Sequence, residues 1–401
     1  MDMKILAIET SCDETGVCIL EIDGTEDGSV DVSIIANKLA SQTKNHRKHG
    51  GVFPTLAKRL HARNLPPLCY NVFKNVKMKP CKQIAESDRK QITRWLSRHP
   101  ECADKLIDLI AEHGTPDVDA IAVTVGPGLA PALWVGCNVA RSIALIADVP
   151  IVPVNHMAGH FLSALAPSTE DDHFTLADPD YPRIALLVSG GHTELIKQST
   201  PHSFQKLGQT RDDAAGEAFD KIGRLLGLPY PAGPHVSKLA KQAHEQIRNS
   251  KLEIRNLFNL PRPMINSDNL DFSFAGLKTA ARKQIEAAEP MSDKQKQAFA
   301  YELETTIVDV LIAKTKKALK QTEARSLLAG GGVVANPHLR EQLEKIASEN
   351  SCDLHICPLD LATDNAVMIG IAGWYAATDD DTEVVTPGRK TAIDVDDRLS
   401  L

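Results

Sequence analysis

RIALLVSGGHTEL, residues 183–195, is the stretch that decides the fold, because a buried strand here turns through two glycines and returns as a second strand. An apolar run that ends in a small, polar turn lets backbone N–H groups point at an anion, since small side chains leave room for it. The stretch therefore predicts a phosphate-binding hairpin with its turn at Ser189, Gly190 and Gly191.

The same pattern occurs near the start of the chain, in ILAIETSCDETGV at residues 5–17. The aligned small residues are Ala7 with Ala185, Ser11 with Ser189 and Thr15 with Thr193. A repeat of about 180 residues is far longer than a solenoid unit, so we interpret it as two similar lobes. Two unrelated hairpins that share small residues are the alternative. Paired turns of this kind are typical of the two-lobed, actin-like ATPase fold, an α/β class in which each lobe is a mixed sheet flanked by helices.

The composition indicates an intracellular globular protein. The 401 residues suit two domains, and 43% hydrophobic residues suffice for ordinary cores. We expect neither a signal peptide nor a membrane span, because the first strand begins at Met3 and no apolar run reaches the ~18 residues that a span needs. The eight cysteines form no C-x-x-C pair and are expected to be reduced. The predicted location is the cytoplasm.

Charge is distributed unevenly along the chain. The formal net charge is −7, yet residues 44–98 hold fourteen Lys and Arg against only Glu86 and Asp88, a local balance of +12. The basic side chains include Lys44, His46, Arg47, Lys48 and His49, and the run Lys74, Lys77, Lys79 and Lys82. This asymmetry predicts one basic face on an acidic body. A solvated helical face is the alternative.

Periodicity predicts alternating strands and helices in a first lobe at residues 1–166. The expected strands are 3–9, 16–22, 31–36, 120–125 and 150–154, and the expected helices are 52–75, 87–98, 102–113, 131–147 and 156–166. Residues 76–100 are expected to be a basic surface insertion. Residues 167–182 are proline- and aspartate-rich and are expected to be a linker.

The second lobe, residues 183–401, is expected to be mostly helical after its hairpin. Its predicted helices are 213–227, 233–248, 273–288 and 292–321, followed by a strand at 326–330. Asn336 is expected to cap the next helix with Pro337 in its first turn, which leaves backbone N–H groups for a ligand. The acidic tail after Asp379 is expected to be loose.

Two histidines, His156 and His160, stand four residues apart, so a helix would place both on one face where they can reach one metal ion. Met157 occupies the place of the glutamate that a zinc peptidase needs as its general base, which excludes that activity. Asp364, at an expected helix start, is the candidate third ligand. A capped or solvent-facing pair of histidines is the alternative.

Three aspartates lie at the start of the predicted helix 213–227. For Asp212 and Asp213 we favour simple matching of the helix dipole. Asp220 lies two turns further along, where that explanation fails, and is better placed to accept hydrogen bonds from sugar hydroxyls.

Together these features resemble the tRNA N6-adenosine threonylcarbamoyltransferase family (TsaD type, formerly called O-sialoglycoprotein endopeptidase), in its bacterial form. The resemblance covers most of the chain outside residues 64–116 and 167–182. The segments that carry it are IETSCDET at 8–15, GPGL at 126–129, the His156/His160 pair, LVSGGHT at 187–193, residues 212–221, YPAGP at 230–234, DFSFAGLKT at 271–279, residues 329–336 and TDN at 363–365.

The resemblance implies an actin-like fold that transfers the threonylcarbamoyl group of threonylcarbamoyl-AMP to N6 of the adenosine 3′ of the anticodon in tRNA and releases AMP. It implies one metal, iron in the family with zinc as the alternative, held by His156, His160 and Asp364. The implied adenylate contacts are Leu187, Val188, Ser189, Gly190, Gly191, Asp220, Gly233 and Asn336. The implied partners are tRNA, a noncatalytic TsaB-type homologue and a TsaE-type ATPase. The basic residues 44–98 then become a candidate tRNA surface, with docking of a partner protein as the rival interpretation.

The sequence departs from the family pattern at Ala232, Val334 and Pro337, so the adenine side of the pocket is expected to differ in shape. Two other classes remain open. An actin-like small-molecule kinase or carbamoyltransferase would share the phosphate turns but gives no reason for the histidine pair. A noncatalytic relative of the same fold would be expected to lack the metal ligands.

Overall fold

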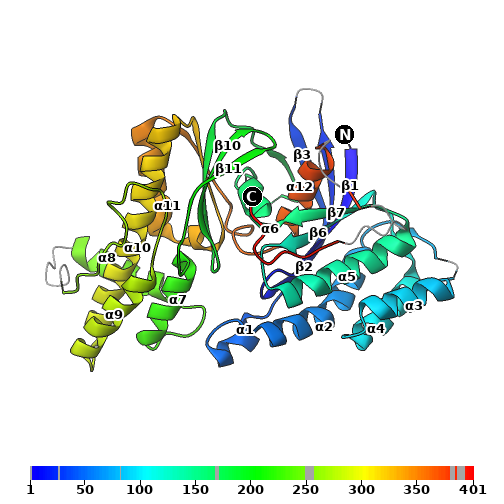
Figure 1. The fold of residues 1–401 in the computed structure, drawn as a ribbon, viewed down its shortest axis with the longest axis horizontal. Helices are drawn as coiled ribbons and strands as arrows, with labels where there is room; N and C mark the ends of the chain where they lie inside the picture. Colours follow the sequence, from blue (N-terminus) through cyan, green and yellow to red (C-terminus); the bar gives the residue numbers. More distant parts are fainter. Residues whose placement is uncertain are drawn as a thin grey trace. The chain divides into compact units, whose positions relative to one another are not determined.

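The structure is a computed structural model that describes residues 2–25, 28–81, 83–167, 171–248, 257–379, 384–385 and 393–401. The chain packs into two compact units (Figure 1). Unit 1 contains Met1–Asp178 and Asp364–Leu401, and unit 2 contains Pro179–Thr363. Each unit is built on one sheet flanked by helices, which is the α/β class that the sequence predicted.

Unit 1 is built on a six-stranded sheet with the order β7-β6-β1-β2-β3-β8. Its strands are β1 (Asp2–Glu9), β2 (Glu14–Gly24), β3 (Val30–Ser41), β6 (Ala120–Gly126), β7 (Ile151–Asn155) and β8 (His173–Leu176). The first three strands form an antiparallel meander, whereas β6 runs parallel to β1 and β7 runs parallel to β6.

Unit 2 repeats this topology in the order β11-β10-β9-β12-β13. Its strands are β9 (Arg183–Val188), β10 (Thr193–Thr200), β11 (Ser203–Gln209), β12 (Ser326–Gly330) and β13 (Asp353–Ile356). Ala7 pairs with Cys18 in the first hairpin and Ala185 pairs with Ile196 in the second, so the two hairpins share one register. The shared register and strand order confirm the internal repeat and explain why apolar residues align on both sides of the two turns.

The helices of unit 1 cover its sheet much as predicted. They are α1 (Thr43–His46), α2 (Pro54–Phe73), α3 (Glu86–Trp95), α4 (Pro100–His113), α5 (Ala130–Ala147), α6 (His156–Ser163) and α12 (Ala366–Ala377), with a 3-10 turn at Arg47–His49 and a two-stranded ribbon of β4 (Met78–Lys79) and β5 (Thr115–Pro116). Pro66 and Pro67 lie inside α2 without dividing it.

Two sequence expectations need correction in unit 1. The basic insertion at 76–100 is not confined to the surface, because Ile84, Ile92 and Leu96 are buried in the main hydrophobic core. In the described part of the chain, α5 is the one helix long and apolar enough to cross a membrane, although no such segment was expected. Several of its buried side chains, among them Val139 and Ile143, belong to that same core, which explains its composition without a membrane.

The predicted lobe boundaries also differ from the structure. Residues 173–176 of the expected linker form β8, which pairs with β3. Residues 364–401, assigned to the second lobe, pack with unit 1 instead, because α12 is apolar on every side and lies against β1, β2, β6 and β7 (Figure 1). The described parts of the tail are also fixed, since the N–H of Asp396 donates to the carbonyl of Val125. The rest of the expected loose tail lies outside the described residues.

Unit 2 places its helices within a few residues of the predicted ranges. They are α7 (Ala215–Leu225), α8 (Gly233–Arg248), α9 (Ala275–Ala288), α10 (Asp293–Thr322) and α11 (Pro337–Asn350), with a 3-10 turn at Gly332–Ala335. Ser292 and Gln295 form a capping box that starts α10. Asn336 caps α11 through its side-chain oxygen and Pro337 follows in the first turn, as predicted.

Candidate metal centre and nucleotide turn

The histidine pair lies at the start of α6, directly after β7. The side-chain oxygen of Asn155 accepts hydrogen bonds from the N–H groups of Met157 (2.8 Å) and Ala158 (3.4 Å), so it fixes the first turn of the helix. His156 and His160 are therefore one turn apart on one face, with ring centroids 4.7 Å apart. Both side chains are buried, which excludes the solvent-facing alternative.

Asp364 reaches the same place from the other end of unit 1's sequence. Asn365 caps α12 by accepting from the N–H of Met368 (2.9 Å), which places Asp364 immediately before the helix. Helices α6 and α12 pack closely because residue 159 is glycine; a Cβ there would lie 3.0 Å from Cγ of Met368. This close packing brings the carboxylate beside the two rings.

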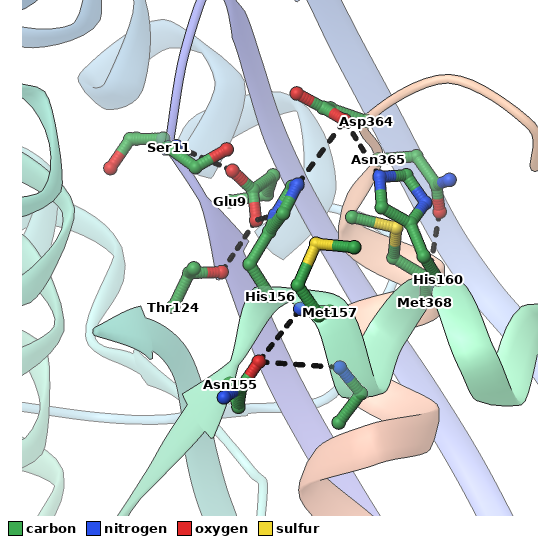
Figure 2. A network of polar contacts seen from close by, with 12 residues as sticks. Glu9, Ser11, Thr124, Asn155, His156, Met157, His160, Asp364, Asn365 and Met368 are labelled. Atoms are coloured by element: carbon green, nitrogen blue, oxygen red, sulfur yellow. Dashed lines mark hydrogen bonds and ion pairs between the residues drawn. The ribbon is translucent and has the colours of Figure 1, made fainter. Parts of the chain in front are cut away.

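The three side chains converge as a metal site requires (Figure 2). Oδ1 of Asp364 lies 3.1 Å from Nε2 of His160 and 3.5 Å from Nε2 of His156, and all three ligand atoms lie within 4.8 Å of one another. Metal–ligand bonds of about 2.1 Å at angles of about 90–110° separate neighbouring donor atoms by about 3.0–3.4 Å. The two distances to Asp364 are close to this range, as one shared divalent ion would require.

Two carboxylates, Glu9 and Asp364, face the histidine pair. Within the described residues, the ion-pair partners of the Glu9 and Asp364 carboxylates are the two histidines. Burial lowers the pKa of His156, but the carboxylates of Asp364 and Glu9 outweigh burial and raise this pKa to about 10. Burial raises the pKa of Asp364, yet the two imidazoles outweigh it and hold the pKa well below its usual range.

His160 supplies a second indication. Its Nδ1 is buried and has no hydrogen-bond partner among the residues that the structure describes, while its Nε2 faces Oδ1 of Asp364. If Nδ1 carries the proton, two lone pairs face each other across 3.1 Å. If Nε2 carries the proton instead, it donates to Asp364 and leaves Nδ1 as a buried acceptor with no partner among the described residues. A cation bound by Nε2 and Oδ1 suits the first tautomer, so these residues can hold a metal.

In unit 2, the turn that was predicted to bind phosphate lies between β9 and β10. Leu187 and Val188 are buried, so any contact that they make with a ligand must come from their backbone. The N–H of Ser189 donates to the carbonyl of His192 (2.8 Å) and closes the turn. Gly190 and Gly191 are exposed, and neither has a left-handed backbone conformation.

The two glycines face open space in the direction of their missing side chains. A Cβ added at either would meet no heavy atom of the described residues within 4 Å. The start of α7 packs against the same turn, because a Cβ on Gly216 would lie 2.5 Å from the carbonyl oxygen of Ser189. The open side is therefore available for an anion, and Gly216 is a structural requirement that the sequence reading missed.

The other predicted adenylate residues surround the start of α8 and α11. Oδ1 of Asp220 accepts from the N–H groups of Ala232 (2.6 Å) and Gly233 (3.4 Å), so this oxygen orders the turn before α8. The amide nitrogen of Asn336 donates to Oε1 of Glu304 (2.6 Å), and its oxygen caps α11. The structure thus brings these residues to two neighbouring helix N-termini, with Glu304 as a buried partner that the sequence did not reveal.

Asp212 and Asp213 do not serve the dipole of their own helix, contrary to our expectation. Oδ1 of Asp212 accepts from the N–H groups of Phe274 (2.7 Å) and Ala275 (3.1 Å) and thereby caps α9. Asp213 forms an ion pair with Lys221 (2.6 Å). A local charge pattern could not reveal a partner that lies about sixty residues away.

The basic segment is partly neutralised and partly buried. Lys79 and Lys77 pair with Asp117 at 2.9 and 3.9 Å. His46 is fully buried, which removes it from the predicted surface cluster. Lys44 and Lys48 are exposed. Lys82 lies outside the described residues.

Comparison with known proteins identifies close sequence relatives. A family model described as tRNA N6-adenosine threonylcarbamoyltransferase matches residues 33–86 and 97–371. Proteins of that name from Polynucleobacter asymbioticus and Polynucleobacter necessarius are 41% and 40% identical, each over 92% of this chain and 91% of the relative. The protein of that name from Ligilactobacillus salivarius is 39% identical over 94% of this chain and 93% of its own length.

Solved structures are more distant. HypF from T. kodakarensis has a TM-score of 0.48 at 13% identity, over 93% of this chain and 47% of that chain. A full-length HypF in its phosphate- and nucleotide-bound form has a TM-score of 0.47 at 12% identity, over 70% of this chain and 42% of that one. The sequence relatives, rather than these structures, are the informative matches.

Proposed function

The chain belongs to the tRNA N6-adenosine threonylcarbamoyltransferase family, and from that membership we propose which of its residues bind each part of the reactants. The reaction transfers the threonylcarbamoyl group of threonylcarbamoyl-AMP to N6 of the adenosine 3′ of the anticodon in tRNA. N6 forms a bond to the carbamoyl carbon and loses a proton, and AMP leaves with the electrons of the broken carbon–oxygen bond. A small-molecule kinase or carbamoyltransferase is not favoured, because relatives matched over nine-tenths of their length carry the transferase name.

We propose that Nε2 of His156, Nε2 of His160 and Asp364 hold one divalent metal, Fe²⁺ in preference to Zn²⁺. The observation that carries this proposal is the convergence of the three donor atoms within 4.8 Å in a buried site. The bound ion would act as a Lewis acid toward a carbonyl oxygen. The residues themselves fix its place: α6 holds the two rings one turn apart, and the cap of α12 holds the carboxylate against them.

We assign the adenylate to unit 2. The open side of Ser189, Gly190 and Gly191 supports phosphate binding through backbone N–H groups, with Leu187 and Val188 anchoring the strand. Gly233 and Asn336 would contact the nucleotide at the N-termini of α8 and α11, where unpaired N–H groups favour anions. Asp220 would shape this region by ordering the turn before α8, since one of its oxygens is engaged there.

The substrate tRNA would contact the basic residues of unit 1, with Lys44 and Lys48 as the first candidates because both are exposed. A TsaB-type homologue and a TsaE-type ATPase are the expected protein partners, and the cytoplasm is the expected location. Partner docking on the same segment is the rival use of this surface.

One experiment tests the function as a whole. The purified protein, loaded with Fe²⁺ and supplied with its expected partners, is mixed with threonylcarbamoyl-AMP, and AMP release is measured with and without tRNA. We expect release that depends on tRNA and equals the threonylcarbamoyladenosine formed. Release that ignores tRNA, or transfer to a small molecule instead, would overturn the proposal.

A further inference from the structure

Glu9 is a buried carboxylate that lies against the histidine pair. It ends β1 and is 0% exposed. Its Oε2 lies 3.3 Å from Nδ1 of His156, on the opposite side of that ring from Asp364 (Figure 2). A charge taken fully out of water is costly unless it is paired and hydrogen-bonded, so this placement requires a reason.

The carboxylate is held in one orientation from two further sides. The N–H of Ser11 donates to Oε1, and the hydroxyl of Thr124 donates to Oε2, each at 2.5 Å. These donors come from the turn after β1 and from β6, whereas His156 comes from α6. Three separate elements therefore fix the direction in which Oε2 faces the imidazole.

The consequence for His156 is a fixed tautomer. An imidazole whose Nδ1–H donates to a carboxylate presents the lone pair of Nε2 on the other side of the ring. Nε2 of His156 is the atom that faces Asp364, at 3.5 Å. The carboxylate also increases the electron density on the ring, which strengthens its bond to a cation.

We propose that Glu9 is a positioning residue for the metal: it holds His156 with its proton on Nδ1 and its Nε2 directed at the ion. This inference rests on the proposed metal site. The turn residue Ser11 is tied to the same carboxylate, so Glu9 also links the first-hairpin turn to the metal ligands. The role of Glu9 is indirect, because the group of residues whose ligand atoms converge does not include it.

Metal affinity tests the inference without using enzyme activity. Zn²⁺ and Co²⁺ are titrated into the metal-free full-length protein against a chromophoric chelator. Glu9→Gln should lower the affinity about 10–100-fold. Thr124→Val, which removes one hydroxyl donor to Glu9, should lower it by less and in the same direction. Glu194→Gln, a change at a buried carboxylate in β10 of unit 2, is the matched control and should leave metal affinity unchanged.

The outcomes separate this inference from the metal site itself. If His160→Ala retains wild-type affinity, the proposed metal site is wrong. If His160→Ala loses the metal while Glu9→Gln and Thr124→Val both keep wild-type affinity, only the role of Glu9 is overturned. Should Glu9→Gln fail to fold, Thr124→Val and ¹⁵N NMR of the Zn²⁺-loaded protein decide: we expect a proton on Nδ1 of His156 and metal on Nε2, and the reverse tautomer refutes the inference.

Discussion

Replacing Gly191 by valine should weaken adenylate binding at least tenfold while leaving the fold of unit 2 almost as stable as before. Among the described residues, a Cβ at residue 191 meets no heavy atom within 4 Å, and the backbone of Gly191 is not left-handed. The added Cβ therefore creates no clash and no left-handed backbone strain in the protein itself. In the proposed assignment, the phosphate lies against this open side, so the new side chain would occupy its place.

The magnitudes follow from these contacts. A side chain in place of glycine at a compatible backbone position changes the free energy of unfolding by about 0.4–1 kcal/mol, chiefly through the unfolded chain. For a unit of this size that corresponds to a melting shift of only about 1–4 °C. Loss of the phosphate contact should weaken AMP binding at least tenfold, which is about 1.4 kcal/mol.

Gly216→Ala is the contrasting variant. Its Cβ would lie 2.5 Å from the carbonyl oxygen of Ser189, so the turn must shift and the cost in stability should exceed about 1 kcal/mol. AMP binding is measured by titration calorimetry and unfolding by differential scanning calorimetry. A Gly191→Val protein that binds AMP within twofold of wild type would refute the assignment of this turn to the phosphate.

Three further outcomes are expected. His160→Ala should remove the metal and the transfer activity from a folded protein, and full metal occupancy by elemental analysis would contradict the ligand set. Charge reversal at Lys44 and Lys48 should weaken the binding of all tRNAs alike and should flatten the dependence of log affinity on log salt by about 0.7–0.9 per lost phosphate contact. Charge reversal at Lys77 and Lys79, which share Asp117 as an ion-pair partner, should reduce affinity and slope by less. An unchanged slope with lost binding of the TsaB-type partner would assign the segment to that interface. Burial lowers the pKa of His61 from 6.5 to about 4. As the pH falls, the unfolded chain therefore binds a proton at His61 at a higher pH than the folded chain does. The free energy of unfolding that is present above pH 6.5 should consequently fall by about 3 kcal/mol as the pH drops toward 4. His61→Gln should lack this part of the pH dependence in urea unfolding curves.

The features predicted best from sequence are those whose cause is local. The two histidines of α6 are one helical turn apart, and helix geometry alone places them on one face. The cap of α11 follows from Asn336 and Pro337, which are adjacent in the chain. The internal repeat was visible because two apolar strands and a small turn recur in the same order, and both hairpins keep the register that this order implies.

The errors arose where a distant partner decides what a side chain does. From sequence, Asp212 was predicted to match the dipole of its own helix. In the structure it accepts hydrogen bonds from N–H groups at the start of α9, about sixty residues later. His46 belongs to a basic run in sequence, yet Gln42 and the N–H of Phe53 hold its ring in the interior. In each case composition gave the charge of the segment but not the direction of the side chain.

By itself, the sequence determined the α/β class, the repeat, most helix and strand positions and the identity of the three metal-ligand candidates, because periodicity, capping and motif spacing are encoded by near neighbours. Only the tertiary structure decided that α12 packs on the first sheet and brings Asp364 to the histidines. It also decided that Glu9, which accepts a hydrogen bond from Thr124, contacts Nδ1 of His156. The physical reason is burial: an all-round apolar helix must find a covered position, and a buried carboxylate must find donors, wherever in the chain these lie.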